Sequence, residues 1–179
     1  MTVKTKLLMI LCLLALPITA AAKDLTLSNA PAQVLFSPHG GCTESIVEAL
    51  SKAKSEVLVQ AYSFTSKPIA KALVDAHRRG IHVEIILDKS NRSRNYNAGD
   101  FMAHAGIPTY IDSAHVMAHN KIIVIDNEVV ITGSFNFTRA AEEHNAENLL
   151  IIRSKELAKD YSENWQKHRG HSEVYRGRP

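Results

Sequence analysis

The sequence predicts an α/β fold, a three-layer α-β-α sandwich around a mixed, mostly parallel central sheet. Up to residue 112, β-branched apolar runs alternate with amphipathic stretches, an order typical of parallel strands covered by helices on both faces. Residues 119–136 then hold two apolar runs with only a tight turn between them, which adds an antiparallel pair. The sheet should therefore be mixed.

The strands are expected where short runs are rich in Val, Ile, Leu and aromatic residues. Besides the two runs of the hairpin, such stretches cover residues 32–37, 56–64, 81–88, 107–112 and 147–153. No linker or internal repeat interrupts this order, so we expect one domain.

Four helices are expected between and after these strands, from N-cap residues, helical periodicity and terminating glycines. The first starts near Thr43, the second follows Ser66 and ends at Gly80, and a short one spans residues 96–105. The last starts at Ser154 and is amphipathic, with an apolar side that includes Leu157, Tyr161 and Trp165.

The first 22 residues have the pattern of a secretory signal peptide. Lys4 and Lys6 precede an apolar run at residues 7–16, Pro17 breaks that run, and residues 20–22 offer a small-residue cleavage site. An uncleaved N-terminal anchor is the alternative. Cleavage would leave residues 23–179 as one domain, periplasmic or secreted, with no stable membrane association.

Charge and cysteine content restrict the partners less than the distribution of charge does. Removal of Lys4 and Lys6 with the signal peptide would leave 19 of the 21 Lys and Arg against 18 Asp and Glu, a net charge of +1 with histidine neutral. Cys42 alone would remain, either as a buried small hydrophobe or as a bridge between two chains. Basic residues cluster in one loop and near the C-terminus, where they could attract a polyanion or only be solvated: Lys89, Arg92 and Arg94, then Lys167, Arg169, Arg176 and Arg178.

The hairpin places polar residues at both of its outer ends. If Asn127 and Glu128 form the loop, Lys121 lies opposite Ser134 and His119 opposite Asn136. Residues two apart on a strand share a face, so these four side chains would emerge together. A one-residue slip of the register would scatter them.

This group suits transfer at phosphorus. Lys121 and Asn136 offer donors for phosphoryl oxygens, and His119 can act as a nucleophile or general acid. Glu147 opens the next strand, and its carboxylate could orient the His119 ring, while Gly133 leaves room for a close approach. Each residue alone is more often a strand end or a turn, but their combination indicates a phosphohistidine mechanism.

The spacing of His119, Lys121, Asp126, Gly133, Ser134 and Asn136 resembles the HKD signature of the phospholipase D superfamily. More narrowly, the chain is similar to the Nuc-like group of short, exported bacterial endonucleases with a single motif. The stretches "FSPHGGC", "QAYSFTS" and "NAENLLII" extend the likeness over nearly the whole mature chain.

The resemblance implies a metal-independent, largely non-specific endonuclease that needs no cofactor. A homodimer with its active site at the interface would supply two copies of His119, one as the nucleophile and the other as the general acid. Lys121, Asn136 and Ser134 would bind the phosphate, Glu147 would orient His119, and Asp126 would be structural. With the basic loop of Lys89, Arg92 and Arg94 as a further contact, the substrate would be DNA, or RNA.

Three alternatives compete with this interpretation. A metal-dependent hydrolase could use His115 and His119, although "HVMAH" lacks the glutamate of the zincin motif. A phospholipase D acting on lipid phosphodiesters would use the same chemistry, but it would need an apolar docking surface that the sequence does not show. A non-catalytic DNA-binding protein would not need an oriented imidazole.

Overall fold

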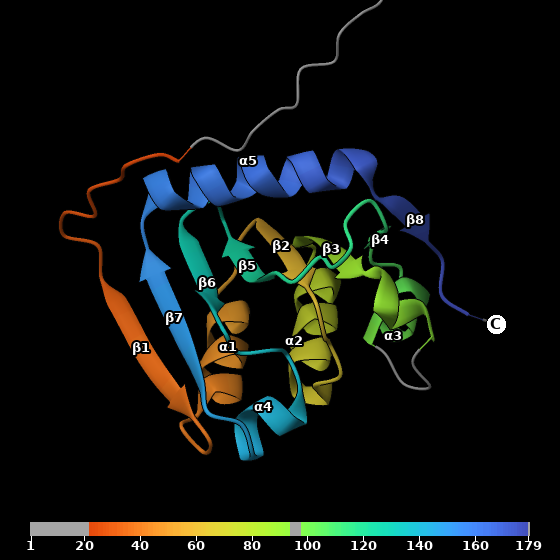
Figure 1. Ribbon diagram of the computed structural model, residues 1–179, viewed down its shortest axis with the longest axis horizontal. Coiled ribbons are helices and arrows are strands. Elements are labelled where there is room, and N and C mark those ends of the chain that lie inside the picture. The colour runs from red at the N-terminus through yellow and green to blue at the C-terminus, as the bar shows by residue number, and fades with distance from the viewer. Residues whose placement is uncertain (1–21, 94–97, 179) are drawn as a thin grey trace, which may run out of the picture.

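The computed structural model describes residues 22–93 and 98–178. Within these ranges the chain forms one eight-stranded sheet with the strand order β1-β7-β6-β5-β2-β3-β4-β8. Figure 1 shows α5 alone along one face of the sheet and α1 and α2 on the other. The predicted α/β sandwich is therefore confirmed. The predicted signal peptide, apart from Ala22, and Arg94 lie outside the described residues.

The sheet is mixed but not mostly parallel, so that part of the prediction is wrong. Only β2–β3 and β3–β4 pair in parallel within the described chain, and the other five neighbouring pairs are antiparallel. The hairpin lies beside β2 in the middle of the sheet, and β7 and β1 extend it antiparallel. The strands are β1 Ala32–Ser37, β2 Glu56–Ala61, β3 His82–Asp88, β4 Thr109–Asp112, β5 Lys121–Ile125, β6 Val129–Gly133, β7 Glu147–Arg153 and β8 Glu173–Tyr175.

The helices begin and end close to the expected positions, and one was not foreseen. The described helices are α1 Cys42–Ser51, α2 Lys67–Arg78, α3 Ala98–His104, the short α4 Arg139–Glu143 and α5 Lys155–His171, with a 3₁₀ turn at Lys89–Ser93. The cap of α1 is Gly41 rather than Thr43. The carboxylate of Glu142 accepts the N–H groups of Gly41 and Thr43, so a distant residue replaces a local cap.

Two apolar layers hold the sandwich together. The larger lies between the sheet and α1–α3, and the smaller packs Trp165 of α5 on β2, β3 and β5. The indole N–H of Trp165 donates to the Val59 carbonyl at 2.9 Å, which fixes α5 on the sheet. Cys42 is fully buried in the larger layer, so it is a core residue and not a bridge between chains. Among the described helices none combines the length and apolarity needed to cross a bilayer.

The hairpin register differs by one residue from the prediction. Ile123 pairs with Ile131 and Ile125 with Val129, so the turn lies at Asp126 and Asn127, which both have positive φ. Continuing this register places Lys121 opposite Gly133 and not opposite Ser134. The turn forms one residue early because Asp126 accepts the N–H groups of residues 54–56, which ties it to the start of β2.

Candidate active site

His119 and Lys121 lie together at the start of β5. The Lys121 ammonium is 3.1 and 3.2 Å from the two ring nitrogens of His119, and it donates to the His119 carbonyl at 2.9 Å. Lys121 is buried, whereas His119 is exposed. Because the ammonium is almost equally far from both ring nitrogens, it lies over the ring face and not along either in-plane lone pair, which leaves a nitrogen free to attack a substrate.

Ser134 and Glu147 meet at the neighbouring strand ends despite the shifted register. The N–H groups of Ser134 and Phe135 both donate to the Asn148 carbonyl, a bulge that turns the chain after Gly133. The Ser134 hydroxyl then donates to the Glu147 carboxylate at 2.6 Å. The bulge therefore brings the Ser134 hydroxyl to the start of β7, beside Glu147.

Gly133 is required at this bulge. Its φ is +144°, and a Cβ atom there would lie 2.3 Å from the Asn148 carbonyl oxygen. The prediction of a close approach at Gly133 is therefore confirmed, although the group that approaches is the backbone of β7.

Lys121 links the two halves of the site electrostatically. Burial lowers the pKa of its ammonium, and the negative charge of Glu147 opposes that shift. The predicted hydrogen bond from His119 to Glu147 is not formed among the described residues. Glu147 instead accepts from Ser134 and from the side-chain amide of Asn145 at 3.0 Å.

Asn136 follows the bulge and is half-buried. Its side-chain oxygen is buried and has no hydrogen-bond partner among the described residues. This oxygen is an acceptor and cannot bind a phosphoryl oxygen, so only the Nδ2 amine of Asn136 could donate to a phosphate.

Asp126 lies at the opposite end of the hairpin from His119. Its carboxylate accepts hydrogen bonds from the segment before β2, including the Ser55 hydroxyl at 2.9 Å. Burial acts to raise the pKa of this carboxyl, but the hydrogen bonds from Glu56 and Ser55 lower it below its ordinary value. These contacts give Asp126 a structural role, as expected.

The two described basic residues of the predicted substrate loop are engaged locally. Lys89 donates to the His115 carbonyl at 2.9 Å, and Arg92 pairs with Glu173 of β8. The Arg92 charge is therefore already balanced, while Lys89, just after β3 and at the same edge of the sheet as the start of β5, has no ion-pair partner among the described residues. Near the C-terminus, Arg178 pairs with Asp100 and Arg169 stacks on Tyr110, so part of that cluster is structural.

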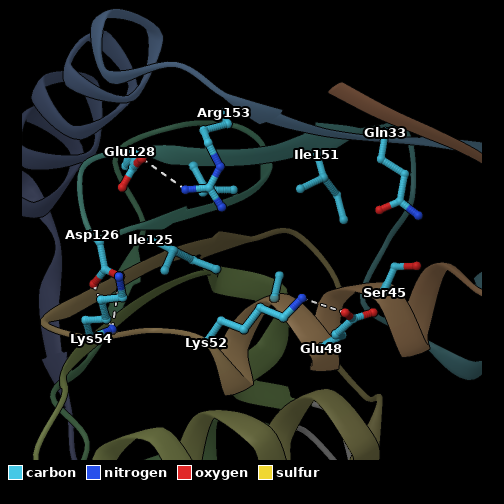
Figure 2. A pocket seen from close by; sticks show the side chains of 12 residues that line it. Gln33, Ser45, Glu48, Lys52, Lys54, Ile125, Asp126, Glu128, Ile151 and Arg153 are labelled. Atoms are coloured by element: carbon cyan, nitrogen blue, oxygen red, sulfur yellow. Dashed lines mark hydrogen bonds and ion pairs between the residues drawn. The ribbon is translucent and has the colours of Figure 1, made fainter. Parts of the chain in front are cut away.

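Two hollows lie at the two ends of the hairpin. One, of about 490 Å³, is lined by His119, Lys121, Gly133, Tyr161 and Asn164. The other, of about 450 Å³, surrounds the turn, and Figure 2 shows its charged side chains occupied with one another, as in the pairs Arg153–Glu128 and Lys52–Glu48. The first hollow is the one that contains His119 and Lys121.

Sequence reasoning missed Tyr62 and Asn145. The centroids of the Tyr62 and His119 rings lie 4.4 Å apart, and the backbone N–H of Tyr62 donates to the Asn120 carbonyl. Tyr62 directly follows β2, the strand that pairs with β5, and this position could have indicated that it lies near His119. His115, by contrast, turns away from His119 and contacts Asp112, so the two histidines do not form the metal site considered above.

Comparison with known proteins agrees with this geometry. A family described as "Cardiolipin synthase, PLD-like domain" matches residues 46–169. A protein named phospholipase D from Rickettsia conorii is 42% identical over 139 residues, covering 78% of this chain and 70% of the relative. A mitochondrial cardiolipin hydrolase from Mus musculus is 30% identical over 151 residues, covering 75% of this chain and 68% of the relative.

Solved structures show the same likeness. The crystal structure of Nuc from Salmonella typhimurium, a phospholipase D family member, superposes with a TM-score of 0.80 at 38% identity. The match covers 83% of this chain and 99% of Nuc. NucT from Helicobacter pylori shares the fold, with a TM-score of 0.75 at 23% identity over 82% of this chain and 99% of NucT.

Proposed function

The chain belongs to the phospholipase D superfamily of phosphodiesterases, and we propose that it is an endonuclease that cleaves nucleic acid without a metal ion. The observation that carries the proposal is the contact of the Lys121 ammonium with the His119 ring, beside the Ser134–Glu147 pair. A nucleophile and a cation thus line one hollow, and a hydroxyl and a carboxylate lie at the adjoining ends of β6 and β7.

The reaction we propose has two displacements at phosphorus. A ring nitrogen of His119 attacks, the bond from phosphorus to the leaving oxygen breaks, and an acid protonates that oxygen. Water then attacks the phosphorus of the phosphohistidine, and the group that protonated the leaving oxygen now accepts a proton from this water. The bond between phosphorus and His119 breaks, which regenerates the free histidine. Lys121 and Asn136 hold the phosphoryl oxygens, where negative charge must be stabilised.

A homodimer would complete this site. One chain provides a single His119, and its Glu147 is bound to Ser134 and Asn145. The partner subunit's His119 would be the acid, and the partner's Glu147 a second candidate to orient the nucleophile. The single active site of the dimer would then form only across the interface.

Nucleic acid is the substrate we favour. The resemblance to single-motif endonucleases and the cationic Lys89 at the same edge of the sheet support it, because phosphate contacts give affinity without sequence preference. We further propose that the mature domain acts in the periplasm or outside the cell, which the signal-like N-terminus supports.

A lipid phosphodiester is the second candidate, and one observation favours it. Val116 and Met117, shortly before His119, are 93% and 52% exposed. The structure thus provides an apolar rim that the sequence did not suggest, and such a rim could dock on a bilayer.

A substrate panel separates the candidates. Mature protein, free of affinity tags, is incubated in excess EDTA with plasmid, single-stranded DNA, RNA, and vesicles of cardiolipin or phosphatidylcholine. The endonuclease proposal expects cleavage of nucleic acid by the wild type and at least a thousandfold loss in His119→Ala. Vesicle hydrolysis alone, lowered by Val116→Ser with Met117→Ser, would assign the lipid function. Binding of DNA without cleavage would leave a DNA-binding protein.

A further inference from the structure

Four side chains that commonly bind metals meet at the C-terminal end of α5, outside the candidate active site. They are Asp112, His115, His168 and His171, and one ligand atom of each lies within 4.8 Å of all the others. Asp112 ends β4, His115 follows in the next loop, and the other two lie three residues apart on α5. Figure 1 shows this end of α5 beside β4 and β8.

The distances within the cluster match a four-coordinate site. The Asp112 Oδ2 atom lies 2.8 Å from Nδ1 of His168, 3.0 Å from Nδ1 of His115 and 3.3 Å from Nε2 of His171. Ligands about 2.0–2.1 Å from a tetrahedral zinc ion are about 3.3 Å from one another. Asp112 is thus already close to this spacing from each histidine, and the histidine nitrogens, which lie within 4.8 Å of one another, would draw together around the ion.

The burial of the four side chains suits a bound ion. The Asp112 side chain is fully buried, whereas those of His168, His171 and His115 are 16%, 37% and 46% exposed. The carboxylate thus forms the floor of the site and the imidazoles its open side, which leaves an entry path. Burial acts to raise the pKa of Asp112, but hydrogen bonds from the three histidines hold it well below its ordinary range.

The backbone of two of the four ligands, His168 and His115, is held by contacts that do not need the ion. The Ser172 hydroxyl donates to the His168 carbonyl at 2.7 Å, and Lys89 donates to the His115 carbonyl. Trp165 anchors the same helix on β2. These contacts lower the entropy that must be lost when the site forms around an ion.

We propose that Asp112, His115, His168 and His171 bind one divalent transition-metal ion of the zinc class in a structural site. Four protein ligands fill a tetrahedral shell, so the ion does not act on the substrate. It joins the end of α5 to the loop that leads from β4 to His119. This metal site takes no part in the proposed cleavage mechanism, and the two proposals can be tested separately.

The test uses mature protein without a histidine tag, stripped with EDTA and dialysed against metal-free buffer. Titration with Zn²⁺ should show one ion per chain and raise Tm by about 5 °C or more, because an ion that binds only the folded state stabilises it. Co²⁺ should give the visible absorption of a tetrahedral complex with nitrogen and oxygen ligands.

Matched variants locate the ion. His171→Ala should weaken Zn²⁺ binding at least tenfold, whereas His144→Ala, an exposed histidine elsewhere, and His119→Ala should bind as the wild type does. If His171→Ala fails to fold, the Co²⁺ spectrum and stoichiometry of the wild type decide. Absence of stoichiometric binding, or binding unchanged in His171→Ala, would overturn the proposal and leave a hydrogen-bond network around Asp112.

Discussion

The Ser134 hydroxyl donates a 2.6 Å hydrogen bond to the Glu147 carboxylate and accepts from the Asn148 N–H at 3.0 Å. One hydroxyl therefore joins the end of β6 to the start of β7, at the bulge that shapes the candidate site. Because Glu147 also acts on the buried Lys121, this bond bears on both stability and chemistry.

Ser134→Ala should lower both stability and activity. A hydrogen bond to a charged group contributes about 1.5–3 kcal/mol, and we expect a loss of about 1.5 kcal/mol in the free energy of unfolding by urea titration. Cleavage by folded protein should fall at least tenfold. Ser51→Ala, which removes an exposed hydroxyl, is the control. Equal effects of the two substitutions would refute a special role for Ser134.

Lys121→Met should abolish cleavage without lowering stability. Burial lowers the pKa of Lys121, so the folded state disfavours its charge at neutral pH. Removing that charge should leave the unfolding free energy unchanged or up to about 1 kcal/mol higher, as is common where function opposes stability. Lys71→Met, at an exposed site, should change neither property. A large loss of stability would instead assign Lys121 a structural role.

Gly133→Ala should destabilise the fold by about 3 kcal/mol or more, since the new Cβ meets the Asn148 carbonyl in a strained backbone conformation. Gly80→Ala is the matched control, with φ +86° but no atom within 4 Å of the added carbon. It should cost about 1 kcal/mol, the strain alone. Chemical denaturation measures both, and similar losses would contradict the close approach at Gly133.

Asp126→Asn should lower stability in a pH-dependent way and spare the chemistry. The folded pKa of Asp126 is depressed, so its contribution is fully present above the unfolded pKa of about 3.9 and is lost as pH falls through the folded value. The variant should be less stable by about 1–2 kcal/mol at pH 7, and this difference should shrink as pH falls below the unfolded pKa of about 3.9. Cleavage per folded molecule should stay within twofold, and a loss comparable to that of His119→Ala would make Asp126 catalytic.

Cys42 should be inert in the native protein. Burial raises the pKa of its thiol to about 11, with Glu142 adding to the shift. A thiol reagent should therefore react only after unfolding, and non-reducing electrophoresis should show no linked dimer. Rapid reaction of folded protein at pH 8 would show that α1 opens.

The sequence predicted most elements well because their signals are local. The strands at residues 32–37 and 147–153 match in full, and Ser154 does cap α5 through the Leu157 N–H. The cap of α1 and the hairpin register failed because Glu142 and the β2 start, both distant in sequence, decide them. The three-residue β8 has too little pattern to detect, since its pairing with β4 defines it.

The candidate site was foreseen in its members but not in its contacts. The motif brought His119, Lys121, Ser134 and Glu147 to one end of the sheet, yet the bulge and the Glu147–Asn145 contact depend on packing. The Asp112 cluster was invisible for the same reason, because its residues come from segments about fifty residues apart.

The stereochemical course at phosphorus tests the central claim most directly. An oligonucleotide with one phosphorothioate of known configuration is cleaved in ¹⁸O-water containing EDTA, and the configuration of the product is determined. Two in-line displacements through His119 predict overall retention. Inversion would mean that water attacks the substrate directly, and it would contradict the phosphohistidine mechanism.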